Sequence, residues 1–199
     1  MDRAWRVVIP LRLSDAKSRL STHTAPQRRA LVIAMARDVV AAARECPSVA
    51  EIRLVTDDDG RVAIGEGIAV VADPGAGLNA AVLAAAVGAP GPVAALLADV
   101  PCATPDALAI ALDECLDQPG FLPDAEGIGT TLVAAPTVAE LTPHFGPRSR
   151  AAHAAAGIRE IPDPSGSALA GLRRDVDSEV DLWDARRIGV GPFTRSALE

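Results

Sequence analysis

Short apolar runs alternate with alanine-rich stretches along this chain, and this alternation narrows the folds that are open to it. The plainest run is residues 93–98, Val-Ala-Ala-Leu-Leu-Ala, which no polar residue interrupts. A strand that is apolar on both faces needs helices to cover both, as in the parallel sheet of an α/β fold. The expected strands are residues 6–10, 51–56, 68–72, 93–98 and 130–135.

The first stretch between strands has clear helix signals. Thr24 and Gln27 have the spacing of a capping box, and Pro26 falls in the first turn, where its missing N–H does no harm. The residues that follow at helical spacing form one apolar face. They are Leu31, Met35, Val39 and Ala42.

Further helices are expected at about residues 78–87, 105–116 and 180–188, whereas residues 136–171, rich in Pro, Gly and Ser, are expected to be irregular. The order of the elements predicts an α/β fold with a doubly wound, mostly parallel sheet flanked by helices. With 199 residues, the chain has the length of a single domain spanning residues 1–199.

Composition excludes several classes of partner. A net charge of −7 argues against nucleic acid, because phosphate backbones need a basic face. No uninterrupted apolar stretch approaches 18 residues, so no membrane span is expected. The three cysteines show no metal-type spacing, and the chain runs from Met1 into a strand without a signal peptide. We therefore expect reduced thiols and a cytoplasmic protein.

Three of the expected strands end in aspartate, at Asp57, Asp73 and Asp99. In open α/β sheets ligands collect beyond the carboxyl ends of the strands, so each carboxylate is a candidate ligand. Turn sequences containing glycine follow Asp57 and Asp73, which indicates that these two serve turns. Asp99 is followed by Val-Pro and has no such explanation.

A basic segment follows the first strand and contains Arg12, Lys17 and Arg19. Three cations at a strand's carboxyl end form a candidate phosphate clamp, although the P-loop glycines are missing. Lys17 is the only lysine among 19 basic residues, which marks it as a position where a compact ammonium is needed. A solvated basic loop is the alternative interpretation.

A second charged segment, Arg-Arg-Asp-Val-Asp at residues 173–177, contains two carboxylates at alternating positions. In an extended backbone Asp175 and Asp177 point to the same side and can share a metal ion. Asp99 would supply a third ligand. The alternative is a charged turn before a helix, with Asp177 or Ser178 as its N-cap.

Glycines and hydroxyls gather in two further segments, Gly-Ile-Gly-Thr-Thr at 127–131 and Phe-Gly-Pro-Arg-Ser at 145–149. Glycines let backbone N–H groups approach an anion, and hydroxyls add donors.

The three histidines have neither triad nor zinc spacing, so we expect structural roles for them: His23, His144 and His153. Trp5 and Trp183 are expected in the core or between helices.

Taken in order, these segments resemble a known family. The order is AKSRL, VTDD, DPGAGLNAA, LLADVP, GTT, FGPRSRAAH and GLRRDVDS. It is similar to the guanylyltransferases of deazaflavin coenzyme (F-420) biosynthesis, which belong to the superfamily of molybdenum-cofactor guanylyltransferase-like enzymes with a nucleotide-diphospho-sugar transferase-like fold. The similarity runs from Val7 to about Thr194. It implies transfer of GMP from GTP to a three-carbon phospho-acid, either phosphoenolpyruvate or 2-phospho-L-lactate.

The resemblance also implies residue roles. Asp99, Asp175 and Asp177 would bind Mg²⁺, as one or two ions, and Lys17 would stabilise the leaving pyrophosphate. Contacts to the nucleotide are implied for Arg12, Lys17, Arg19, Gly77, Leu78 and Asn79. Contacts to the carboxylate of the acceptor are implied for Thr130 or Thr131, Gly146 and Ser149.

Two alternatives remain at this level. One is another enzyme of the superfamily that transfers GMP or CMP to a molybdopterin or a sugar-alcohol phosphate. The other is a nucleotide-binding regulator without activity, which would have no need of a complete set of metal ligands. The sequence contains no indication of the oligomeric state.

Overall fold

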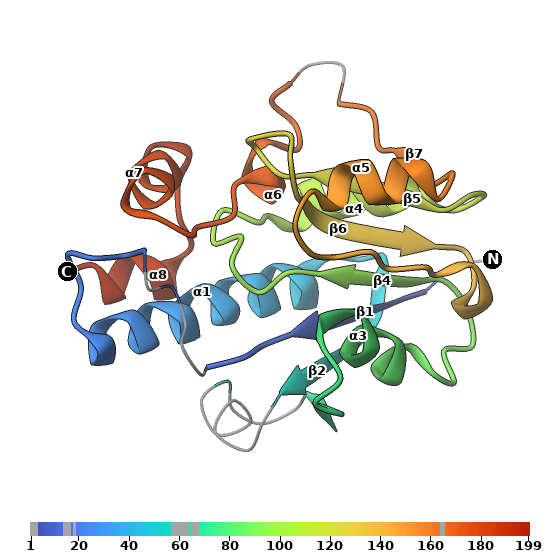
Figure 1. The fold of residues 1–199 in the computed structure, drawn as a ribbon, viewed down its shortest axis with the longest axis horizontal. Helices are drawn as coiled ribbons and strands as arrows, with labels where there is room; N and C mark the ends of the chain where they lie inside the picture. The colour runs from blue at the N-terminus through green and yellow to red at the C-terminus, as the bar shows by residue number, and fades with distance from the viewer. Residues whose placement is uncertain (1–3, 14–16, 18, 57–63, 65–67, 164–165) are drawn as a thin grey trace.

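The computed structural model describes residues 4–13, 17, 19–56, 64, 68–163 and 166–199. Within these residues, seven strands form one sheet in the order β3-β2-β1-β4-β6-β5-β7 (Figure 1). The strands are β1 (Trp5–Pro10), β2 (Val49–Thr56), β3 (Ala69–Ala72), β4 (Val93–Leu96), β5 (Gly120–Pro123), β6 (Thr130–Ala135) and β7 (Arg159–Glu160). The helices are α1 (Ala25–Glu45), α3 (Leu78–Ala86), α4 (Pro105–Asp113), the 3-10 turn η1 (Val138–Glu140), α5 (Ser149–Ala155), α6 (Ala170–Arg173), α7 (Glu179–Ile188) and α8 (Pro192–Ala197).

The sheet is mostly parallel, as predicted, and β6 is its reversed strand. β1 pairs in parallel with β2 and β4, β2 with β3, and β5 with β7. β6 is antiparallel to both β4 and β5. The connection from β5 to β6 is short, and only an antiparallel pair can be joined that way. All five predicted strands are present, but β5 and β7 were not predicted.

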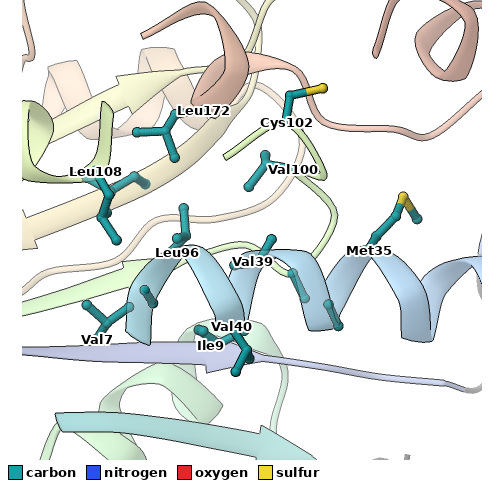
Figure 2. Packing of buried hydrophobic residues seen from close by; sticks show 14 of the residues in the cluster. Val7, Ile9, Met35, Val39, Val40, Leu96, Val100, Cys102, Leu108 and Leu172 are labelled. Atoms are coloured by element: carbon teal, nitrogen blue, oxygen red, sulfur yellow. The ribbon is translucent and has the colours of Figure 1, made fainter. Parts of the chain in front are cut away.

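Helices cover both faces of the sheet, which confirms the doubly wound architecture. One buried cluster joins the sheet to α1, α4, α6 and α7, and Figure 2 shows its side chains converging between α1, β1 and β4. The other lies on the opposite face, where α3 contributes Ala81 and Val82. The alternation of strand side chains explains the division, because Val7 and Ile9 enter the first cluster and Val8 the second.

Local signals predicted the helix starts well. Thr24 and Gln27 form the expected capping box at the start of α1. The apolar face expected for α1 is buried. It consists of Leu31, Met35, Val39 and Ala42. The prediction of irregular structure for residues 136–171 was wrong, since α5 and β7 lie there and α6 begins at Ala170.

Several smaller expectations have clear outcomes. Asp73 serves its turn, with its carboxylate accepting the N–H of Gly75 at 2.8 Å. The turn expected at residues 57–60 lies outside the described residues. Trp5 is buried, but the expectation for Trp183 was wrong: this side chain is exposed on α7, beneath the guanidinium of Arg187.

The three cysteines are free and buried. Burial raises the pKa of Cys102 and of Cys115 to about 12, which keeps both as unreactive thiols. No helix within the described parts of the chain is long and apolar enough to cross a membrane.

Gly171, in α6, provides the first testable prediction. A Cβ at this position would lie 2.2 Å from the carbonyl oxygen of Cys102. Gly171→Ala should therefore push α6 away from the loop after β4 and lower the free energy of unfolding by about 1–3 kcal/mol, measured by urea denaturation. Gly91→Ala is the matched control, because its nearest atom is 3.8 Å away. Equal stability of the two variants would contradict the close approach.

Candidate active site

A cleft of about 400 Å³ opens at the carboxyl ends of the parallel strands β1, β2, β3 and β4. This edge includes the point between β1 and β4 where the strand order reverses, which is where ligands bind in open α/β sheets. The cleft has an apolar floor and a charged rim. Its lining residues are Pro10, Leu11, Arg12, Lys17, Arg19, Val32, Val55, Asp73, Leu78, Ala81, Leu97, Ala98, Asp99 and Asp177.

Lys17 joins two aspartates from distant parts of the sequence. Its Nζ donates to Oδ2 of Asp99 at 2.5 Å and to Oδ1 of Asp177 at 2.6 Å. Burial alone would lower the pKa of Lys17, but the two carboxylates outweigh it and raise that pKa. The ammonium is therefore charged at neutral pH and compensates both aspartates, together with Arg19 at Asp177.

The backbone of Lys17 is in the left-handed region, with φ of +60°. A residue with a side chain rarely adopts this conformation, and when it does the surrounding structure has to hold it. Here the two ion pairs fix the side chain in the cleft wall. The strained backbone and the paired ammonium together mark Lys17 as a functional position.

The two arginines of the basic segment have different environments. Arg19 is bonded to Asp177 and otherwise exposed, so its charge lies at the rim of the cleft. Nε of Arg12 donates to Oδ2 of Asp73 at 2.8 Å, while 51% of its side chain is exposed. This pairing lowers the pKa of Asp73. Asp73 thus serves both its turn and Arg12, and the second role was not predicted from the sequence.

Asp175 has the most perturbed carboxyl group of the site. Burial, followed by the charges of Asp99, Asp124, Asp177 and Glu126, raises its pKa to about 7. One oxygen, Oδ1, is buried and has no hydrogen-bond partner among the described residues. The segment of Asp175 is fixed against the loop after β4, because the N–H of Val176 donates to the carbonyl of Asp99 at 3.0 Å.

The 173–177 segment precedes a helix, as the alternative interpretation predicted, while the sharing of a metal ion by Asp175 and Asp177 stays a prediction. Ser178 is the N-cap of α7 and forms a capping box with Asp181. Asp177, one residue earlier, lines the cleft and binds Lys17 and Arg19. The turn before the helix is therefore also the element that carries Asp175 and Asp177 to the site.

Sequence reasoning missed two further acidic residues, Asp124 and Glu126. Within the described parts of the chain, their oxygens and one of Asp175 lie within 4.8 Å of one another and form a group able to hold a metal ion. This group shares only Asp175 with the predicted trio of metal ligands. The other two members of the trio, Asp99 and Asp177, are joined by Lys17. Asp124 follows β5, so recognising that strand would have shown another aspartate at a strand's carboxyl end.

Asp124 has a structural task as well. Its two carboxylate oxygens accept the N–H groups of Ile128 at 2.8 Å and of Gly129 at 2.6 Å. A Cβ on Gly129 would lie 2.3 Å from Oδ2 of Asp124, so only glycine permits this approach. The carboxylate thereby shapes the loop that leads into Thr130 and Thr131.

The second glycine-containing segment, residues 145–149, leads into α5 and is hydrogen-bonded to α3. Asn79 pairs with the backbone of Phe145, donating through Nδ2 to its carbonyl at 3.0 Å and accepting its N–H at 2.8 Å. Gly146 has φ of +143° and Arg148 has φ of +58°, so the turn into α5 uses left-handed backbone twice. His153 on α5 is fully buried and bonded to Thr130, as expected for a structural histidine.

The structure gathers the predicted residues in two neighbouring groups. Six of them line the cleft: Arg12, Lys17, Arg19, Leu78, Asp99 and Asp177. Asp175, Gly77 and Asn79 do not line it but adjoin residues that do. Thr130, Thr131, Gly146 and Ser149 form the second group, which the Asn79–Phe145 pairing joins to the start of α3.

The acidic groups fit a divalent cation. Oδ1 of Asp99 and Oδ1 of Asp175 are both buried and lack a hydrogen-bond partner among the described residues. Orphaned carboxylate oxygens and a raised carboxyl pKa are the features expected where buried acidic groups are arranged around a cation site. Hard oxygen ligands of this kind suit Mg²⁺.

Comparison with known proteins gives a consistent result, although no family model matches the chain. The phosphoenolpyruvate guanylyltransferase of Streptomyces coelicolor is 47% identical, over 96% of this chain and 93% of that protein. The protein of the same name from Salinispora arenicola is 46% identical, over 98% and 93%.

Solved structures support the fold. A nucleotide-diphospho-sugar transferase from Desulfovibrio desulfuricans superimposes with a TM-score of 0.73 over 98% of this chain and 93% of that chain, at 15% identity. A 4-diphosphocytidyl-2C-methyl-D-erythritol synthase gives a TM-score of 0.57 at 14% identity, over 94% and 99%. The expected nucleotide-diphospho-sugar transferase-like fold is confirmed.

The buried His153 leads to a prediction about acid stability. Burial lowers its pKa to about 4, against about 6.5 in an unfolded chain. Between these values the unfolded chain binds a proton that the folded protein does not, so stability falls as the pH falls. From about pH 7 to about pH 5 this should cost about 2 kcal/mol. Urea denaturation measures the free energy of unfolding, which should change less between pH 7 and pH 5 for His153→Asn than for the wild type. Parallel pH curves of the two proteins would contradict the lowered pKa of His153.

Proposed function

The chain belongs to the phosphoenolpyruvate guanylyltransferase family, and we propose that it transfers GMP from GTP to phosphoenolpyruvate and releases pyrophosphate. 2-Phospho-L-lactate, which differs by a double bond and its hydrogens, is the second candidate acceptor. The observation that carries the proposal is the convergence of Lys17, Asp99 and Asp177 in one cleft at the carboxyl ends of the strands. The proposed context is coenzyme F-420 biosynthesis in the cytoplasm, a compartment that the free cysteines support.

The proposed reaction needs no nucleophile from the protein. A phosphate oxygen of the acceptor attacks the α-phosphorus of GTP, the bond from that phosphorus to the β-phosphate oxygen breaks, and pyrophosphate leaves. The product contains a new phosphoanhydride bond. Because both reactants are polyanions, their mutual repulsion is the main obstacle, and the site has to supply positive charge.

Asp99, Asp175 and Asp177 would hold the divalent cation, which we propose to be Mg²⁺. The orphaned oxygens of Asp99 and Asp175 support this assignment, as does the negative charge crowded around Asp175. When bound, Mg²⁺ supplies positive charge that offsets the charge of both phosphates. Both oxygens of Asp124 accept backbone N–H groups, whereas both oxygens of Asp177 are paired with the side chains of Lys17 and Arg19, which would turn to the phosphates when the cation binds.

Lys17 and Arg19 are the proposed contacts of the triphosphate. The Lys17 ammonium already lies in the cleft wall, where it can donate to an oxygen of the leaving pyrophosphate. Arg19 offers its guanidinium at the rim. Arg12 can reach phosphate only by sharing or leaving Asp73. Gly77, Leu78 and Asn79 would lie near the base and ribose.

The acceptor is proposed to bind next to the cation, at the second group of residues. Thr130 or Thr131, Gly146 and Ser149 would contact its carboxylate. Asn79 ties this group to α3 through Phe145, so the nucleotide and acceptor sides are held in one rigid unit. Fixed positions for two reactants are worth several orders of magnitude in rate.

The activity can be tested directly. The protein is incubated with Mg²⁺, GTP and either acceptor, and the guanylylated product and pyrophosphate are followed by mass spectrometry and a coupled assay. Product with phosphoenolpyruvate supports the proposal. Product only with CTP or with another phosphorylated acceptor would indicate a different enzyme of the superfamily, and no product with any pair would favour the regulator.

Asp99→Asn tests the role of the strand-end aspartate. The amide keeps the shape of the side chain but removes the charge that Lys17 and the cation require, so kcat should fall by about 100-fold or more while the fold is retained. Steady-state kinetics measure kcat, and circular dichroism checks the fold. Asp113→Asn, at an exposed position at the end of α4, is the matched control. A folded Asp99→Asn variant with full activity would remove the assignment.

A further inference from the structure

His153 lies where three segments of the proposed acceptor site meet. Its Nδ1 is 3.0 Å from Oγ1 of Thr130 and 2.8 Å from the carbonyl oxygen of Ser149. Its Nε2 accepts the backbone N–H of His144 at 2.9 Å, in the segment that precedes Phe145 and Gly146. One imidazole thus contacts β6, α5 and the loop between them.

The ring is held firmly in this position. It stacks on Phe121 of β5, with ring centroids 5.3 Å apart and an interplanar angle of 23°. Phe145 packs edge-on, with centroids 5.7 Å apart. None of the side chain is exposed. Packing on two aromatic rings fixes the plane of the imidazole, and its hydrogen bonds decide which way the ring faces and where its proton lies.

Two independent contacts determine the tautomer. A backbone N–H can only donate, so Nε2, which accepts from His144, has no proton. A carbonyl can only accept, so Nδ1, which faces the oxygen of Ser149, has the proton. The imidazole is therefore neutral, with its hydrogen on Nδ1.

This tautomer constrains the hydroxyl of Thr130. Because Nδ1 already has a proton, which it shares between the carbonyl oxygen of Ser149 and Oγ1 of Thr130, this hydroxyl can only accept from Nδ1 and cannot donate to it. Within the described parts of the chain, His153 is the hydrogen-bond partner of this hydroxyl. The proton of Thr130 is thus left for another acceptor. Thr131 lies deeper: none of it is exposed, against 4% of Thr130, and no residue of the described chain orients its hydroxyl.

We propose that His153 is a positioning residue for acceptor recognition: its Nδ1–H holds Oγ1 of Thr130 as an acceptor, so that the threonine proton is donated to the carboxylate of the three-carbon phospho-acid. The inference rests on the proposed function and assigns the contact to Thr130 over Thr131. It also explains why a neutral histidine serves here. A charged imidazole would put a second N–H against the N–H of His144, which would disrupt the loop that carries Gly146.

The first test separates acceptor binding from chemistry. His153→Leu removes both ring nitrogens, whereas His153→Asn keeps a side-chain amide that can lie near the place of Nδ1. His153→Leu should raise KM for phosphoenolpyruvate by roughly tenfold or more, with KM for GTP and kcat within about twofold of wild type. His153→Asn should recover most of the loss. His23→Gln is the matched histidine control outside this network.

A double-mutant cycle with Thr130→Val tests the coupling itself. If His153 acts through Thr130, Thr130→Val should raise KM for phosphoenolpyruvate by a similar factor, and adding His153→Leu should raise it little further. Full multiplication of the two factors would overturn the inference. An equal rise in KM for GTP would do the same, because it would indicate general distortion.

The outcomes are distinguishable from failure of the proposed function. If wild-type protein gives no product with either acceptor, the proposed function fails. If wild type is active and the His153 and Thr130 variants keep its KM for phosphoenolpyruvate, only the positioning role fails. Should His153→Leu not fold, His153→Gln replaces it in the cycle with Thr130→Val, because its amide reaches the place of Nε2 and leaves no donor at the place of Nδ1; full multiplication there would again overturn the inference.

Discussion

The ion pairs of Lys17 with Asp99 and Asp177 are the interaction on which the cleft depends. One carboxylate follows β4, the other precedes α7, and the ammonium comes from the segment after β1, so the three meet only through tertiary structure. Burying carboxylates next to one another is costly: burial first, and the neighbouring charges second, raise the pKa of Asp175. The molecule accepts that cost at one edge of the sheet, where the fold itself directs ligands.

Rigid supports hold this charged edge in place. Gly171 lets α6 approach the loop after β4, and the N–H of Val176 bonds to the carbonyl of Asp99. Asp124 fixes the turn before Thr130 through two backbone N–H groups. The first two devices use glycine and backbone groups, and the third uses a side chain that does not line the cleft. Such pre-organisation is what a reaction between two polyanions requires.

Much of the fold could be predicted from the sequence, because its signals are local. The capping box of α1 and the apolar run of β4 depend on neighbouring residues. β5 was missed because Gly-Phe-Leu-Pro begins and ends with strand breakers, and β7 because it has two residues. Pairing depends on distant partners, so neither the reversal of β6 nor the Asn79–Phe145 contact could be predicted.

The candidate site also contains residues that local sequence signals predicted and residues that they did not. Asp99 stood out as an unexplained strand end and Lys17 as the single lysine, and the structure brings them together. Spacing gave Asp175 and Asp177, whereas Asp124 and Glu126 depended on a strand that was not recognised.

The central claim is that the three predicted aspartates bind the cation. Crystals soaked with Mn²⁺ and GTP test it most directly, by anomalous diffraction at the manganese edge. The account predicts a peak at coordination distance, about 2.0–2.3 Å, from carboxylate oxygens of Asp99, Asp175 and Asp177. A peak only between Asp124 and Glu126, or none in the cleft, would contradict it.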